Sequence, residues 1–177
     1  EGNFDWIEPD DEFHAFINDL QRPVGTYLYG RRIYEVMSVF ESDEVFESVY
    51  AEQGVEVSPA VRDFASIWRA AEKVVYSRTL EEVTTARTRL ERAFDPEAVR
   101  ELKASSAADL SIAGPELAAH ALRAGLVDEL QLTLSPVAVG GGKRALPDGL
   151  RIDLELTDEL RFASGIVYLG YRVLAGD

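Results

Sequence analysis

The chain has 177 residues, of which 46% are hydrophobic and 28% charged, which is typical of one folded domain. Its net charge of −14 argues against nucleic acids and anionic membrane surfaces as partners, because both bind basic surfaces. With no cysteine and two histidines, the chain cannot build disulfides, cysteine zinc sites or a multi-histidine metal centre. No stretch is apolar enough to span a membrane and none is typical of an export signal, so we expect a cytoplasmic protein without a metal.

Helical and strand-like patterns alternate along the first half of the chain. Acidic residues at Asp10 and Asp11 predict the start of a helix, and Pro23 ends it. Residues 41–58 are acidic and weakly patterned, so we expect a solvated connection there, helical in part at most. The remaining expected elements are helices over 31–40 and from Pro59 to Trp68, and strands over 24–29, 73–77 and 84–90, the last with Thr85, Arg87 and Arg89 facing water.

The second half continues the alternation and ends in two strands. The expected elements are helices over 96–103 and 116–123, and strands over 110–113, 128–139, 152–162 and 166–174. The short turn at Ser164-Gly165 predicts that the last two strands form an antiparallel hairpin. Strands that alternate with helices are typical of an α/β domain with a mostly parallel sheet.

Residues that suit an anionic ligand follow three of the predicted strands. These are Gly30-Arg31-Arg32, Ser77-Arg78 and Gly114-Pro115. Ligands of open α/β sheets bind beyond the carboxyl ends of the strands, where helix N-termini, glycine and arginine can meet a phosphate. The same residues also fit ordinary turns and solvated surface positions. No GxGxxG or Walker-type motif is present, which disfavours a Rossmann dinucleotide domain or a P-loop.

Several segments resemble one known family. Residues 28–35, LYGRRIYE, resemble a strand-to-helix segment of dihydrofolate reductases. They are closer still to the "GRRTYE" version in the reductase domain of the bifunctional riboflavin-biosynthesis deaminase-reductase. Residues 74–80 and 125–142, with LVDEL, Ser135-Pro136 and three glycines, are similar to further segments of that family. The resemblance implies a single dihydrofolate reductase-like domain over residues 1–177: a mostly parallel mixed sheet flanked by helices, with a C-terminal antiparallel hairpin.

The resemblance also implies that the protein binds NADPH. Gly30, Arg31 and Arg32 match residues that meet the cofactor phosphates. The positions that match the contact with the adenosine 2′-phosphate are Ser77 and Arg78. The pyrophosphate turn of the family matches Ala113, Gly114, Pro115, Glu116 and Leu117. The family often has two or three glycines in this turn, whereas this sequence has one, and its proline removes a hydrogen-bond donor.

The N-terminal segment differs from the family pattern. Relatives begin with an apolar strand and an "SLDG"-like turn, which precede a segment resembling residues 2–6. In the family, that first strand is central to the sheet and its turn lines the substrate pocket. The family's first central strand is not in this sequence. We therefore expect a gap between the strand near 110–113 and the strand near 130–137.

On the substrate side, the resemblance points to the helix that contacts the pteridine in dihydrofolate reductases. The matching residues are Trp6, Asp11 and Phe16. Asp11 lies near the position of a carboxylate that pairs with a two-nitrogen ring edge, and it is the substrate-side candidate for catalysis. Alternatively, Asp10 and Asp11 only cap the helix. We expect a pocket between this helix and the carboxyl ends of the strands.

The leading functional hypothesis is an NADPH-dependent reductase of a pyrimidine-like, pterin-like or ribosylamino small molecule. Its main version resembles a 5-amino-6-(5-phosphoribosylamino)uracil reductase of riboflavin biosynthesis, and a dihydrofolate reductase proper is the second version. The other class is a non-catalytic descendant that binds NADPH or only self-associates, because a fold can outlive its activity. A homodimer stays open as the assembly.

Overall fold

The computed structural model describes residues 10–52 and 54–174. Its helices are α1 (Asp11–Gln21), α2 (Arg31–Met37), the short 3-10 helix η1 (Ser38–Glu41), α3 (Asp43–Glu52), α4 (Pro59–Ala70), α5 (Pro96–Ser105) and α6 (Pro115–Arg123). The strands are β1 (Val24–Gly30), β2 (Glu72–Tyr76), β3 (Thr88–Glu91), β4 (Asp109–Ala113), β5 (Glu129–Leu134), β6 (Leu154–Arg161) and β7 (Val167–Val173). None of the helices described is long and apolar enough to cross a membrane.

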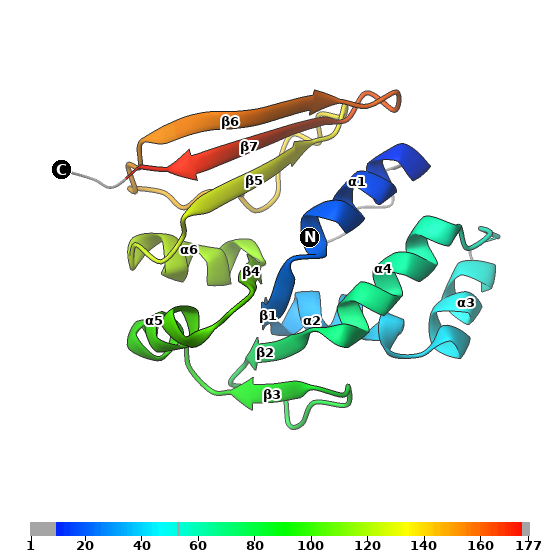
Figure 1. The fold of residues 1–177 in the computed structure, drawn as a ribbon, viewed down its shortest axis with the longest axis horizontal. Coiled ribbons are helices and arrows are strands. Elements are labelled where there is room, and N and C mark those ends of the chain that lie inside the picture. The colour runs from blue at the N-terminus through cyan, green and yellow to red at the C-terminus, as the bar shows by residue number, and fades with distance from the viewer. Residues whose placement is uncertain (1–9, 53, 175–177) are drawn as a thin grey trace.

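A four-stranded sheet with the order β3-β2-β1-β4 forms the centre of the molecule. All its pairings are parallel, so the carboxyl ends of the four strands lie along one edge. One face of the sheet packs Tyr27 and Tyr29 against Trp68 of α4. The opposite face packs Leu28 and Val74 against α5 and α6. Because helices cover both faces (Figure 1), the central strands are mostly buried, as parallel strands usually are.

The second sheet is antiparallel and has the order β5-β7-β6. Strands β6 and β7 form the C-terminal hairpin that the sequence predicts. Helix α1 lies against one face of this sheet (Figure 1), where Phe16 meets Tyr168 with ring centroids 4.8 Å apart and Phe162 at 5.3 Å. This aromatic cluster attaches the second sheet to the rest of the molecule through side chains.

The predicted gap lies between β4 and β5. The two strands belong to different sheets, and no hydrogen-bonded pairing joins them. Between them is a cavity of about 540 Å³ whose lining includes Leu110 and Ile112 from β4 and Leu130 and Gln131 from β5. The prediction of a break at this place is therefore confirmed.

Residues 41–58 are partly helical and mostly exposed, as the sequence suggests, but the segment also contributes a buried side chain to the core. The segment begins at the last residue of η1, Glu41, and contains the whole of α3. Phe46 is fully buried and packs with Val61 and Ala65 of α4. The segment holds few large apolar residues among many carboxylates, so its one buried face does not produce a clear helical period.

Two predicted strands, over 84–90 and 128–139, differ from the observed ones by several residues at one end. Thr85 is buried rather than exposed to water: its hydroxyl lies 3.3 Å from the Tyr34 hydroxyl and 2.7 Å from that of Thr88. Arg87 has φ 54, a left-handed conformation that ends extended structure, so β3 begins only at Thr88. Strand β5 ends at Leu134 rather than 139, just before Ser135 and a proline that cannot donate to a ladder.

Candidate functional site

The three predicted strand ends lie side by side at one edge of the parallel sheet. In the register of the sheet, Gly30 at the end of β1 is level with Tyr76 of β2, and Tyr29 is level with Ala113 of β4. The residues that follow these strands therefore emerge next to one another, above the carboxyl ends in the order β2, β1, β4. Gly30 and Gly114, more than eighty residues apart in the sequence, therefore lie at adjacent strand ends. A common anion site at this edge requires this arrangement.

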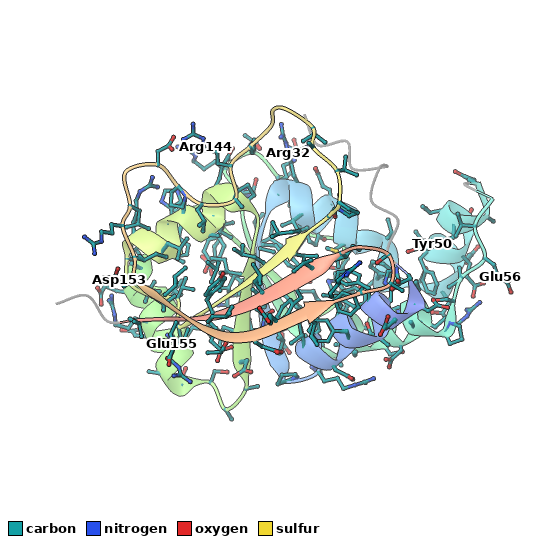
Figure 2. The ribbon with its side chains drawn as sticks, turned by 90° about the horizontal axis from the view of Figure 1, so that it is seen from above. Arg32, Tyr50, Glu56, Arg144, Asp153 and Glu155 are labelled. Carbon is teal, nitrogen blue, oxygen red and sulfur yellow. The ribbon has the colours of Figure 1, made fainter. Side chains whose placement is uncertain are left out.

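Helix α2 begins directly after β1 and places two arginines at this edge. Gly30 is the N-cap of the helix, and Arg31 is its first residue. The Arg31 guanidinium group donates from Nε to Glu35 Oε1 at 2.6 Å and from Nη1 to Thr79 Oγ1 at 3.1 Å, so it joins α2 to the loop after β2. Arg32 is exposed and makes no ion pair with a described residue. Figure 2 shows it on the same side of the molecule as Arg144.

The strand end at Ser77 forms a tight, internally bonded loop. Ser77 is 8% exposed, and its hydroxyl oxygen accepts the backbone N–H groups of Thr79 at 3.2 Å and Leu80 at 3.0 Å. The hydroxyl proton itself is still available for donation to a ligand. Arg78 is exposed, and within the described part of the chain it has no carboxylate partner. Its charge can therefore meet an anion without breaking an existing pair.

The turn between β4 and α6 has the backbone geometry of an anion site. Gly114 has φ 96, a conformation that other residues rarely adopt, and Ile33 of α2 lies 3.9 Å from the position of a Cβ. The Ala118 N–H is the first to bond within the helix, to Gly114 O at 2.9 Å. The N–H groups of Glu116 and Leu117 precede it, so they point out of the helix end and can serve a ligand. Pro115 has none to offer, and the Leu117 side chain is buried in the core.

The Glu116 carboxylate lies beside this turn, and the positive charges of Lys143 and Arg32 lie near it. Glu116 forms an ion pair with Lys143, from the segment between β5 and β6. The hydrogen bond and charge of Lys143, with a smaller contribution from Arg32, hold the Glu116 pKa below its usual value. Lys143 was not identified by sequence reasoning, because nothing in its local pattern connects it with α6.

Sequence reasoning also missed Arg92, which follows β3 at the same edge. Its Nη1 donates to the carbonyl oxygens of Ser77 at 3.3 Å and Leu80 at 2.5 Å. Its Nη2 donates to Glu81 O at 3.3 Å. A lone arginine after a short strand has no sequence signature, so only the fold reveals its position.

The predicted substrate residues are not gathered into one pocket. Asp10, rather than Asp11, is the N-cap of α1: its carboxylate accepts the N–H groups of Phe13 at 2.8 Å and Ser164 at 3.0 Å. Asp11 is exposed in the first turn, and Phe16 packs in the aromatic cluster below the second sheet. Trp6 lies outside the described residues. The substrate roles of these residues stay predictions.

Two cavities are present near these elements, and neither is lined by Asp11 or Phe16. The first is the gap between β4 and β5. The second lies along the outer side of α6, where the segment containing Lys143 and Arg144 passes Glu116 and His120. Among the described residues, no group of three or more acidic or histidine side chains could hold a metal ion.

Residues 3–168 match the RibD C-terminal domain family. The chain belongs to this family. The uncharacterized protein YyaP of Bacillus subtilis (strain 168) is 27% identical over 175 residues, which cover 97% of this chain and 85% of YyaP. The family assignment agrees with the resemblance seen in the sequence.

Two solved structures share the fold of this RibD C-terminal domain. A candidate riboflavin biosynthesis protein from Shewanella sp. PV-4 superposes with a TM-score of 0.70 and 18% identity, over 98% of this chain and 89% of the other. A pyrimidine reductase-like protein from Corynebacterium diphtheriae gives 0.57 and 12%, over 94% and 83%. These likenesses concern the fold, and they confirm the predicted dihydrofolate reductase-like class with its parallel sheet and antiparallel C-terminal part.

Proposed function

We propose that this protein is an NADPH-dependent reductase that binds the cofactor phosphates along the carboxyl ends of β2, β1 and β4. One observation carries the proposal: two outward N–H groups after Gly114 and two arginines without carboxylate partners among the described residues, Arg32 and Arg78, follow neighbouring strands at this edge. A chain with a net charge of −14 repels anions at long range, so a local concentration of donors and cations needs an explanation. Phosphate groups are the anions that such an arrangement fits.

The residues present suit the parts of the cofactor. Gly114 has no side chain of its own, which favours close approach of a pyrophosphate to the backbone of this turn. Ser77 and Arg78 provide a hydroxyl donor and a guanidinium group for a ribose 2′-phosphate. When bound, the nicotinamide supplies a hydride, and the protein contributes binding and orientation. Pro115 lacks a backbone N–H and so leaves one donor fewer in this turn, which makes the arginines more important for binding.

For the substrate we propose a pyrimidine-like, pterin-like or ribosylamino compound, with 5-amino-6-(5-phosphoribosylamino)uracil as the leading example. The proposal is supported by the family and by the description of the Corynebacterium structure as pyrimidine reductase-like. Asp11 is the proposed orienting carboxylate on the family resemblance alone, because neither of the two cavities described above is lined by it.

A second candidate is a protein that binds NADPH without reducing a substrate. It is favoured by the position of Phe16, whose ring is part of the aromatic cluster rather than of a cavity. The cofactor edge would be the same in both cases, so only turnover separates the two functions.

The test has two steps. First, NADPH should raise the melting temperature of the protein, because a ligand specific for the native state stabilises it. Second, NADPH oxidation is followed in the presence of a panel of aminopyrimidines, ribosylaminopyrimidines and pterins. A stabilised protein that oxidises NADPH with one of these supports the reductase. Stabilisation without turnover on any compound supports the binding protein, and the absence of stabilisation contradicts both.

A further inference from the structure

The loop at residues 77–81 is held from three directions. Inside the loop, the Ser77 hydroxyl oxygen accepts two backbone N–H groups. From α2, the Arg31 guanidinium group donates to Thr79 at 3.1 Å. From the end of β3, Arg92 donates to three carbonyl oxygens of the loop. The carbonyl oxygens of Ser77, Leu80 and Glu81 therefore all face one guanidinium group, that of Arg92.

We propose that Arg92 is a positioning residue: it fixes the 77–81 loop in the conformation that presents Ser77 and Arg78 to the cofactor. It thereby determines the preference for a cofactor that carries a 2′-phosphate. This inference rests on the proposed function, because it concerns the same edge of the sheet.

The chemistry of arginine explains why this residue suits the task. A guanidinium group is planar and carries five donors in a fixed arrangement, so one side chain can hold several carbonyl groups in defined directions. Here Nη1 serves Ser77 and Leu80, and Nη2 serves Glu81. No ion pair joins Arg92 to a carboxylate within the described residues, so its role is to hold the backbone.

The position of Arg92 in the sheet gives the loop a rigid reference. Arg92 follows Glu91, which is level with Tyr76 in the parallel pairing of β2 and β3, and the Ser77 N–H donates to Glu91 O at 2.9 Å. The loop is therefore attached to β3 at its base by the backbone and at its far end by the arginine. Arg78 lies between these two attachments, which limits the directions its side chain can take.

Loss of the Arg92 side chain would leave two exposed carbonyl groups and one partly buried one to water, so the global stability should change little. The loop, however, would lose its outer attachments and sample more conformations. Binding would then have to order it again, which weakens the affinity for the ligand that depends on it.

The experiment compares Arg92→Ala with Arg92→Lys and with Arg89→Ala as the matched control. Arg89 lies on β3, is exposed and pairs with Glu91 at 3.4 Å, so its removal makes the same change in charge without touching the loop. Hydrogen exchange of the Thr79 and Leu80 amides is measured in the protein without ligand. The dissociation constants of NADPH and NADH are measured for all variants.

In Arg92→Ala we expect exchange of both amides to become about tenfold faster, and the NADPH dissociation constant to rise about tenfold while NADH changes by less than about twofold. Arg89→Ala should leave exchange unchanged and affect NADPH by about twofold at most. Arg92→Lys should lie between Arg92→Ala and the wild type, because lysine keeps the charge but not the planar fork.

Unchanged amide exchange in Arg92→Ala would overturn the proposal. If NADPH affinity fell while exchange stayed unchanged, Arg92 would contact the phosphate directly. Equal weakening of NADPH and NADH would also overturn it. If the wild type binds neither cofactor, the proposed function fails. The assignment of Arg92 to cofactor preference falls with it, whereas the exchange rates still show whether Arg92 fixes the loop.

Discussion

The two sheets of this protein are stabilised in different ways. In the parallel sheet, the central strands are buried on both faces: Leu28 is 3% exposed, and Val74 and Val75 are not exposed at all. In the antiparallel sheet, α1 covers one face, and β6 has seven exposed residues out of eight. No backbone pairing joins the sheets across the gap between β4 and β5.

This difference bears on function, because the candidate cofactor residues extend from the sheet that is covered on both sides. A rigid, fully packed sheet fixes the relative positions of the three junctions at its edge. The antiparallel sheet depends instead on a cluster of aromatic side chains and on polar links such as the bond from the Ser164 N–H to Asp10 Oδ2 at 3.0 Å. We therefore expect the two sheets to respond differently to mutation.

The largest effect is expected in the core of the parallel sheet. Trp68→Ala should lower the free energy of unfolding by about 4–5 kcal/mol, because the indole is completely buried against Tyr27 and Tyr29 and the change leaves a large cavity. Denaturant unfolding measures the loss. Leu156→Ala, at a position 48% exposed on β6, is the control and should change stability by no more than about 0.5 kcal/mol. Similar losses for both would remove the contrast between the sheets.

A smaller loss is expected at the contact between α1 and the second sheet. Phe162→Ala removes a ring that lies 5.2 Å from Phe13 and 5.3 Å from Phe16, and it should cost about 3 kcal/mol. Because the cluster around Phe162 includes residues of α1 and β7 but none of β1 or β2, hydrogen exchange should accelerate in β5–β7 more than in β1 and β2. Equal acceleration of exchange in both sheets would show that the two sheets unfold as one unit, and it would contradict this prediction.

At the cofactor edge, Arg78→Ala should weaken NADPH binding by about 1.5–3 kcal/mol, because a charge-assisted bond to the 2′-phosphate is lost. NADH, which lacks that phosphate, should lose much less. Isothermal titration with both cofactors at low and high salt measures the difference, and the effect should shrink at high salt because Arg78 is exposed. The same loss for both cofactors would place Arg78 away from the phosphate.

The smallest effect concerns pH and the N-terminus of α1. The hydrogen bond from the Phe13 N–H, with a further one from Ser164, holds the Asp10 pKa below its usual 3.8. A carboxylate with a lowered pKa stabilises the fold above its unfolded pKa, and this contribution is lost as the pH falls through the folded pKa. Asp10→Asn keeps the cap without the charge. The melting temperatures of the wild type and this variant should therefore converge in acid, between about pH 5 and pH 2. A difference that does not depend on pH would contradict the role of the ionised carboxylate.

The sequence predicts most of the parallel sheet because its elements carry strong local signals. Apolar runs such as residues 24–29 and prolines at helix starts such as Pro59 and Pro115 are confirmed at close to their predicted positions. The bounds and the buried face of helix α3 are not predicted, because its single buried ring, Phe46, lies in an acidic segment. Strand β3 is overextended because its pattern does not reveal the left-handed backbone at Arg87.

Part of the candidate cofactor site can also be predicted, because some of its residues carry local sequence signals. Glycine and arginine at strand ends are visible in the sequence, and the family resemblance connects them. The contacts of Arg92 and Lys143 depend on which distant segments the fold brings together, such as α6 and the segment after β5. A sequence shows the residues that touch a ligand more readily than those that hold them in place.

We propose that the carboxyl edge of β2, β1 and β4 binds NADPH and recognises its 2′-phosphate. The most direct test is to titrate the wild-type protein with NADPH and with NADH under identical conditions. The account predicts that NADPH binds more tightly by about one to three orders of magnitude, as expected for one or two arginines on the extra phosphate. Equal affinity for the two cofactors, or no binding of either, would contradict it.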